Sequence, residues 1–139
     1  MPLAKQTVIH AALALALVGT ALVDSRAQTV DSPEALLQLW QEALDRNDYA
    51  AYVACLHSGS REVPEYGSEE AMDFWAGEVS DLIREGFDGR FAIEVVTDGG
   101  VRFPPGSVRA YPIVNGRPIR KAIVLIEEDG HWTILRLFS

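Results

Sequence analysis

The side chains best suited to bind a ligand lie in a segment that has basic residues and no acidic ones. Between Asp98 and Glu127 the chain contains no Asp or Glu. Its basic residues there are Arg102, Arg109, Arg117, Arg120 and Lys121. Guanidinium groups hold a carboxylate through paired hydrogen bonds, and a tyrosine hydroxyl adds another donor. The segment therefore indicates a site for a small anionic or amphipathic ligand.

Three residues of this segment are predicted to share one face of a sheet. Asn115-Gly116 is a strong signal for a two-residue hairpin turn. In that hairpin Tyr111 lies opposite Arg120, and Arg109 has the same orientation because strand side chains alternate. We predict that Arg109, Tyr111 and Arg120 bind the ligand. The alternative is that the arginines only balance the acidic third helix, or charges across a dimer contact.

Aromatic side chains on the helices are the other candidates for a binding site. Trp40, Tyr52 and Phe74 are predicted to take part in it. Phe74 falls off the apolar stripe of its helix, so it is expected to face a ligand, a partner or a loop. The alternative for such residues is the core, where aromatic side chains at helical spacing usually lie.

A carboxylate or a histidine within hydrogen-bonding reach of Tyr52 or Tyr111 inside a pocket would favour catalysis over simple binding. The candidates are Glu94, Asp98 and His57. Glu94 is the only carboxylate in the interior of a strand pattern, and the rule that lone acids are exposed predicts a solvated outer position for it. We therefore predict no catalytic residue.

No metal site and no cofactor is predicted. His57 and His131 are related by no motif, and the acidic clusters resemble solvated ends of a helix and a hairpin. Cys55 lies on a short apolar helix and is expected to be a small buried hydrophobe. The chain also lacks a glycine-rich phosphate loop.

Residues 1–27 are predicted to be a signal peptide. Lys5 supplies the positive start, Val8–Val23 is almost wholly apolar, and Ser25 and Ala27 have the spacing of a signal-peptidase site. The mature protein is then exported, either periplasmic or secreted, with no stable membrane insertion after cleavage. The formal charge of the whole chain, −8, argues against nucleic-acid binding, because phosphates would be repelled.

Two alternatives stay open at the N-terminus. Gly19-Thr20-Ala21 is a second possible cleavage site. An uncleaved membrane anchor is the other alternative, and it is disfavoured because the apolar run is short for a span of ~20 residues.

The remainder, residues 28–139, is predicted to form one α+β domain with three helices followed by an antiparallel sheet. The helix signals are caps and stops at Ser32, Asn47, Asp48, Ser68 and Gly86, with a loop at His57–Gly67.

The predicted strands begin where the spacing of apolar residues changes from helical to alternating. Phe91, Ile93, Val95 and Thr97 are expected on one face, and Pro112 is expected to cause a bulge or a slipped register.

The last hairpin turns at Asp129-Gly130, and its register is predicted to pair Glu128 with His131, Ile126 with Thr133, and Val124 with Leu135.

These features together resemble the nuclear-transport-factor-2-like superfamily. The resemblance covers the opening Ser32-Pro33-Glu34…Trp40…Asn47-Asp48-Tyr49 and the closing hairpin with Asp129-Gly130-His131-Trp132. It implies a cone in which three N-terminal helices pack on a curved antiparallel sheet. The superfamily contains isomerases, dehydratases, polyketide cyclases and non-catalytic domains, so fold does not select the function.

The isomerase pattern of that superfamily, a first-helix Tyr with two sheet carboxylates, is not matched, because Leu36–Leu44 has no Tyr. The leading hypothesis is therefore a non-catalytic exported domain that binds a small ligand or a protein. The alternative is a cofactor-independent isomerase, dehydratase or cyclase with an acid–base pocket in the cone.

A homodimer through the sheet is also predicted. Helices that precede a single antiparallel sheet cover one face of it, yet both faces of the last hairpin are apolar. One face carries Val124, Ile126, Leu135 and Leu137. The resemblance implies the same arrangement, and the alternative is that strong curvature lets the cone's interior bury both sets.

The signal peptide gives the first testable prediction. Protein purified from an exporting host should begin near Gln28, or near Leu22 if the earlier site is used. Intact-mass analysis checks this, and a membrane-bound product that still carries Met1 would contradict it.

Overall fold

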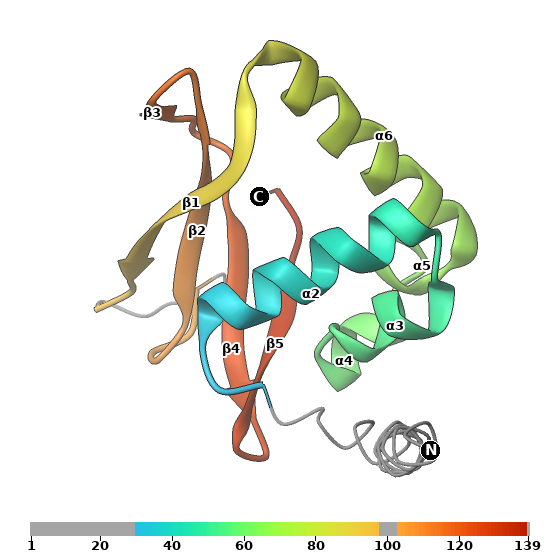
Figure 1. Ribbon diagram of the computed structural model, residues 1–139. Coiled ribbons are helices and arrows are strands. Elements are labelled where there is room, and N and C mark those ends of the chain that lie inside the picture. The colour runs from blue at the N-terminus through green and yellow to red at the C-terminus, as the bar shows by residue number, and fades with distance from the viewer. Residues whose placement is uncertain (1–29, 98–102, 139) are drawn as a thin grey trace, which may run out of the picture.

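The structure is a computed structural model that describes residues 30–97 and 103–138 (Figure 1). The predicted signal peptide and its two cleavage sites lie outside the described residues, as do Asp98 and Arg102. In the described ranges, no helix is long and apolar enough to cross a membrane.

Helices α2, α3 and α6 form where capping residues predicted them. The Ser32 hydroxyl accepts a hydrogen bond from the Ala35 amide at 3.1 Å, and Asn47 ends α2 in the left-handed conformation at φ 54°. Asp48 and Ser68 cap α3 and α6 in the same way as Ser32 caps α2. The bounds are Pro33–Arg46 for α2, Tyr49–Ala54 for α3 and Glu69–Glu85 for α6.

The segment expected to be a loop at His57–Gly67 contains two single-turn helices instead. These are α4 (Ser58–Arg61) and α5 (Pro64–Gly67). The first is held by its cap, since the His57 ring nitrogen Nδ1 accepts a hydrogen bond from the Gly59 amide at 3.0 Å. Such short turns have no apolar period, so the sequence pattern does not distinguish them from a loop.

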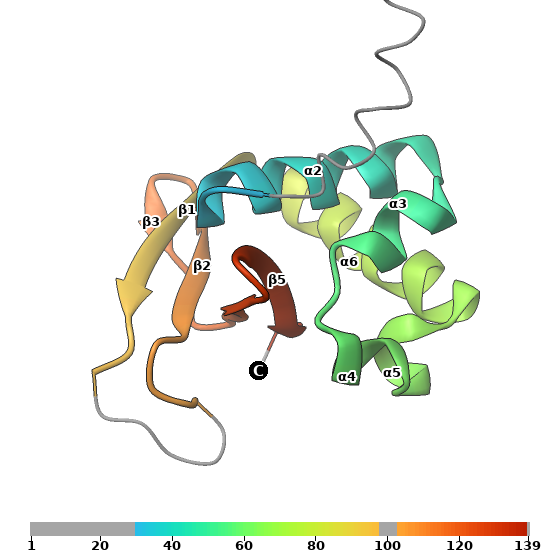
Figure 2. The same cartoon turned by 90° about the horizontal axis from the view of Figure 1, so that it is seen from below.

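An open antiparallel sheet follows the helices in sequence and lies against them in space, so the α+β class is confirmed (Figures 1 and 2). The strand order is β1-β2-β4-β5, and β3 pairs with β2 alone. The bounds are Phe87–Val95 for β1, Val108–Val114 for β2, Arg117–Pro118 for β3, Ile123–Glu128 for β4 and His131–Arg136 for β5.

One face of this sheet forms the core with the helices. Ala110, Ile123 and Leu125 are buried there against Leu36 and Trp40 of α2. Burying each large apolar side chain is worth about 1.5–3 kcal/mol, so this layer supplies most of the fold's stability. We call the opposite side of the sheet the outer face.

The apolar face predicted for the first strand is only partly correct. Phe91 and Ile93 pack against the core, but Val95 is 64% exposed and Thr97 is exposed as well. β1 is an edge strand, so its last residues have a neighbouring strand on one side only.

The turn at Asn115-Gly116 is confirmed, with φ 53° and 79°, but the register changes beyond it. Val114 pairs with Arg117 as predicted, whereas Ala110 pairs with Ile123. The strands therefore rejoin two residues late, and the expected ladder pairing of Tyr111 with Arg120 is not made.

The last hairpin also departs from the predicted register at one place. Its turn and the pairs Glu128↔His131 and Ile126↔Thr133 are as expected. Val124, however, pairs with Arg136 instead of Leu135, because a β-bulge adds one residue to β5.

Helix α4 is tied to the tip of this hairpin by a carboxylate. The Ser58 amide donates to Glu128 Oε1 at 3.0 Å, and the Ser58 hydroxyl donates to the other oxygen. His57 Nε2 lies 3.7 Å from the same carboxylate. Burial opposes the charge on Glu128, but the hydrogen bonds from Ser58 and the nearby cations outweigh it and lower the pKa of Glu128.

The second prediction concerns this contact. Glu128→Gln should lower the free energy of unfolding by about 1 kcal/mol at pH 7, the usual worth of such hydrogen bonds. A folded-state pKa below the unfolded value means that the difference is complete above the unfolded pKa and disappears as pH falls through the folded one. Urea unfolding across acidic pH measures this.

Glu127→Gln is the matched control, because it removes the same charge from an exposed neighbour. Equal losses in the two variants would show that the contact with Ser58 contributes nothing.

Candidate functional site

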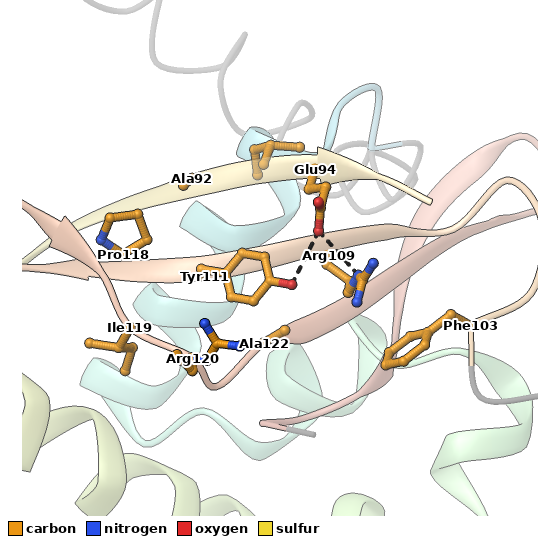
Figure 3. A pocket seen from close by; sticks show the side chains of 10 residues that line it. Ala92, Glu94, Phe103, Arg109, Tyr111, Pro118, Ile119, Arg120 and Ala122 are labelled. Carbon is orange, nitrogen blue, oxygen red and sulfur yellow. Dashed lines mark hydrogen bonds and ion pairs between the residues drawn. The ribbon is translucent and has the colours of Figure 1, made fainter. Parts of the chain in front are cut away.

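The outer face of the sheet carries an open pocket of about 550 Å³ (Figure 3). Helix α2 lies behind the sheet in this view, so the pocket is not the space between helices and sheet. Its lining residues are Ala92, Ile93, Glu94, Phe103, Arg109, Tyr111, Pro118, Ile119, Arg120 and Ala122.

Strand pairing builds the floor of the pocket. Ala92 pairs with Tyr111 and Glu94 pairs with Arg109, so side chains from β1 and β2 emerge side by side. The register change supplies a wall, because the chain leaves the ladder after Pro118 and returns to it only at Ile123. Ile119, Arg120 and Ala122 of this stretch border the pocket together with Pro118 (Figure 3).

A polar network centres on Glu94. The Tyr111 hydroxyl donates to Glu94 Oε1 at 3.1 Å, and Arg109 Nε lies 3.3 Å from the same oxygen. The arginine contact is an ion pair without hydrogen-bond alignment, because that Nε has no hydrogen-bond partner in the described chain. Burial, together with the hydrogen bond to Glu94, raises the pKa of Tyr111, so its hydroxyl stays protonated and can donate.

The pocket has more positive than negative charge. The Arg109 guanidinium lies 4.7 Å from the centre of the Phe103 ring, a cation–π contact. Arg120 is exposed, and no carboxylate in the described ranges lies within 4 Å of its guanidinium. Among the described residues that line the pocket, one carboxylate therefore faces two guanidinium groups, in a protein that is acidic as a whole.

Neutralising the acidic helix α6 explains the position of one of these basic residues. Lys121 Nζ lies 4.0 Å from Glu78 of the acidic helix α6. Arg109 pairs instead with Glu94 of β1, and no described carboxylate lies within 4 Å of the Arg120 guanidinium. The two pocket arginines are thus not explained by the charge of α6.

The structure brings together three of the six predicted site residues. Arg109, Tyr111 and Arg120 line the same pocket. Trp40 and Tyr52 are instead fully buried in the core. Burial raises the pKa of Tyr52, whose hydroxyl donates to the Tyr66 carbonyl at 2.5 Å.

Phe74 lies elsewhere on the molecule. It is 56% exposed and packs edge-on against Trp75 at 4.8 Å, in a shallow groove beside α5. This position, off the apolar stripe of α6, is the one expected from its place in the helix.

Two contributors to the pocket were not predicted as ligand-binding residues: Glu94 was named only as a candidate catalytic carboxylate, and Phe103 was not singled out. Glu94 has a side chain that is 53% exposed, as expected of an outer residue, yet it holds both Tyr111 and Arg109. The β1–β2 register would have identified it, but the connection between the strands contains two turn signals, Asp98-Gly99-Gly100 and Pro104-Pro105-Gly106, and neither alone determines that register. Phe103 follows the undescribed segment and had no signal of its own.

The other reactive groups are not gathered at the pocket. Within the part of the chain that the structure describes, no cluster of three or more His, Cys, Asp or Glu could hold a metal ion. Cys55 is buried, and that burial raises the pKa of its thiol to about 12.

Comparison of the chain with protein families, with curated proteins and with solved structures found no match. The geometry of the outer-face pocket therefore carries the proposed function.

Proposed function

We propose that the chain is an exported, non-catalytic binding domain whose outer-face pocket takes a small anionic ligand with an apolar part. The observation that supports this most is Arg120, a guanidinium with no described carboxylate partner, at the edge of a pocket that also holds a protonated tyrosine hydroxyl. A ligand carboxylate would complete its hydrogen bonding.

Glu94 has a positioning role in this proposal. By accepting from Tyr111 and pairing with Arg109, it holds both side chains in the pocket before a ligand arrives. Preorganised donors lose less conformational entropy on binding, which raises affinity. The apolar part of the ligand would lie over Ala92, Ile119 and Pro118.

The third prediction tests this site with octanoate as the probe. At low salt, isothermal titration calorimetry should detect binding, and Arg120→Gln should weaken it about tenfold, the effect of losing one charge-assisted hydrogen bond. Arg117→Gln is the matched control, because Arg117 is exposed on the same hairpin but does not line the pocket.

Two outcomes would contradict the proposal. Either the wild type shows no binding of octanoate, or both arginine variants weaken binding equally. In the second case the effect would come from net charge alone.

A cofactor-independent acid–base enzyme is the second candidate. The observation in its favour is that Glu94 lies within hydrogen-bonding reach of Tyr111 inside a pocket, which is the arrangement such chemistry requires. That contact meets the expectation that would favour catalysis, but we rank the enzyme second because Glu94 is half exposed and ion-paired with Arg109 instead of desolvated. Exchange of ligand protons for deuterium, followed by NMR and abolished by Glu94→Gln, would favour the enzyme.

Self-association through the outer face stays a proposal. Val124 and Thr133 are already buried within one chain, so the remaining apolar area is centred on Ile126 and Leu135, which are half buried. These two lie toward β5, away from the pocket between β1 and β2.

The fourth prediction is that the wild type forms a dimer that Ile126→Lys dissociates, because a charge would then enter the apolar contact. Light scattering measures the solution mass. A wild type that runs as a monomer at tens of micromolar would overturn the proposal.

A further inference from the structure

A row of opposed residues crosses the outer face from β1 to β5. Glu94 pairs with Arg109, Arg109 with Val124, and Val124 with Arg136. Directly opposed residues of neighbouring strands share a face of the sheet. The row therefore places one carboxylate at its β1 end and two guanidinium groups on either side of Val124.

The bulge in β5 is what brings Arg136 into this row. Ile134 and Leu137 both belong to the helix-side core, so the two residues between them, Leu135 and Arg136, are left on the outer side. Regular alternation would have placed only one residue there, and the predicted register placed Leu135 opposite Val124. Arg136 thus extends the positive surface beyond the pocket.

Arg136 has no anionic partner in the described chain. Its Nε is inaccessible to solvent and has no hydrogen-bond partner there, and no described carboxylate lies within 4 Å of its guanidinium. Glu94 is at the far end of the row and pairs with Arg109. Enclosing part of a cation without a counter-charge is costly, so a second anion would be favoured beside Arg136.

The spacing of the two guanidinium-bearing residues suits a ligand with two charged ends. Neighbouring strands are ~4.8 Å apart, which puts the Cα atoms of Arg109 and Arg136 about 10 Å apart across β4. We propose that the ligand is a dianion of the α,ω-dicarboxylate class. One carboxylate is held by Arg120, Tyr111 and Arg109, and the other by Arg136. In this ligand the apolar chain crosses β4 above the buried Val124 instead of lying over Ala92, Ile119 and Pro118. This inference rests on the proposed function of the pocket.

The fifth prediction compares octanedioate with octanoate, which have the same chain but different numbers of carboxylates. In the calorimeter at low salt, octanedioate should bind the wild type about tenfold more tightly, because a second charge-assisted contact is made. Arg136→Gln should remove this advantage and leave the affinity for octanoate unchanged. Arg136→Lys should restore part of it, and Arg117→Gln should not affect it.

The outcomes separate this inference from the function on which it rests. If octanoate binds but octanedioate binds no more tightly, or if Arg136→Gln weakens the binding of both compounds equally, the ligand is not a dianion held by Arg136. The proposed function of the pocket is then retained. If neither compound binds the wild type, both proposals fail. If the Arg136→Gln variant does not fold, the affinities of the wild type for the two ligands still test the inference.

Discussion

A missing backbone N–H group shapes the pocket. Proline has no amide hydrogen, so Pro112 can accept the hydrogen bond that Ile119 donates but cannot return one. The hairpin that starts at Asn115-Gly116 therefore stops after two pairs, and β4 rejoins β2 two residues out of register. The residues displaced from the ladder become the wall that carries Arg120. Without this interruption, the outer face would be an unbroken sheet in this region.

The charges on that face act together with the acidity of the rest of the molecule. A positive pocket in a negative protein concentrates the local field, and a small anion approaching the surface is drawn toward it. The same field is screened as salt increases, which makes ionic strength a control on any binding there. Glu94 limits this positive charge while holding the donors in place.

The parts of the fold that could be predicted are those determined by neighbours in sequence. Capping by Ser32, termination by Asn47 and the turn at Asp129-Gly130 each depend on a few adjacent residues, and all are present in the structure. The bulge opposite Val124 depends instead on how side chains from separate strands pack, which a single strand pattern does not contain.

The candidate site shows the same division. Alternation of side chains along β2 correctly places Arg109 and Tyr111 on one face, so half of the site could be proposed from the sequence. Trp40 could not be assigned by pattern, because a helical aromatic that packs in a core has the same spacing as one that lines a cavity. Glu94 required the pairing of two strands joined by a long connection.

The reactivity of the buried Cys55 thiol can be used to measure how often the protein opens. Its backbone carbonyl accepts a hydrogen bond from the Ile134 amide at 2.8 Å, so the end of α3 is joined directly to β5 in the core. With the thiol enclosed and its pKa raised to about 12, an alkylating reagent finds almost no thiolate in the native state. The rate of labelling therefore measures how often the helical layer separates from the sheet.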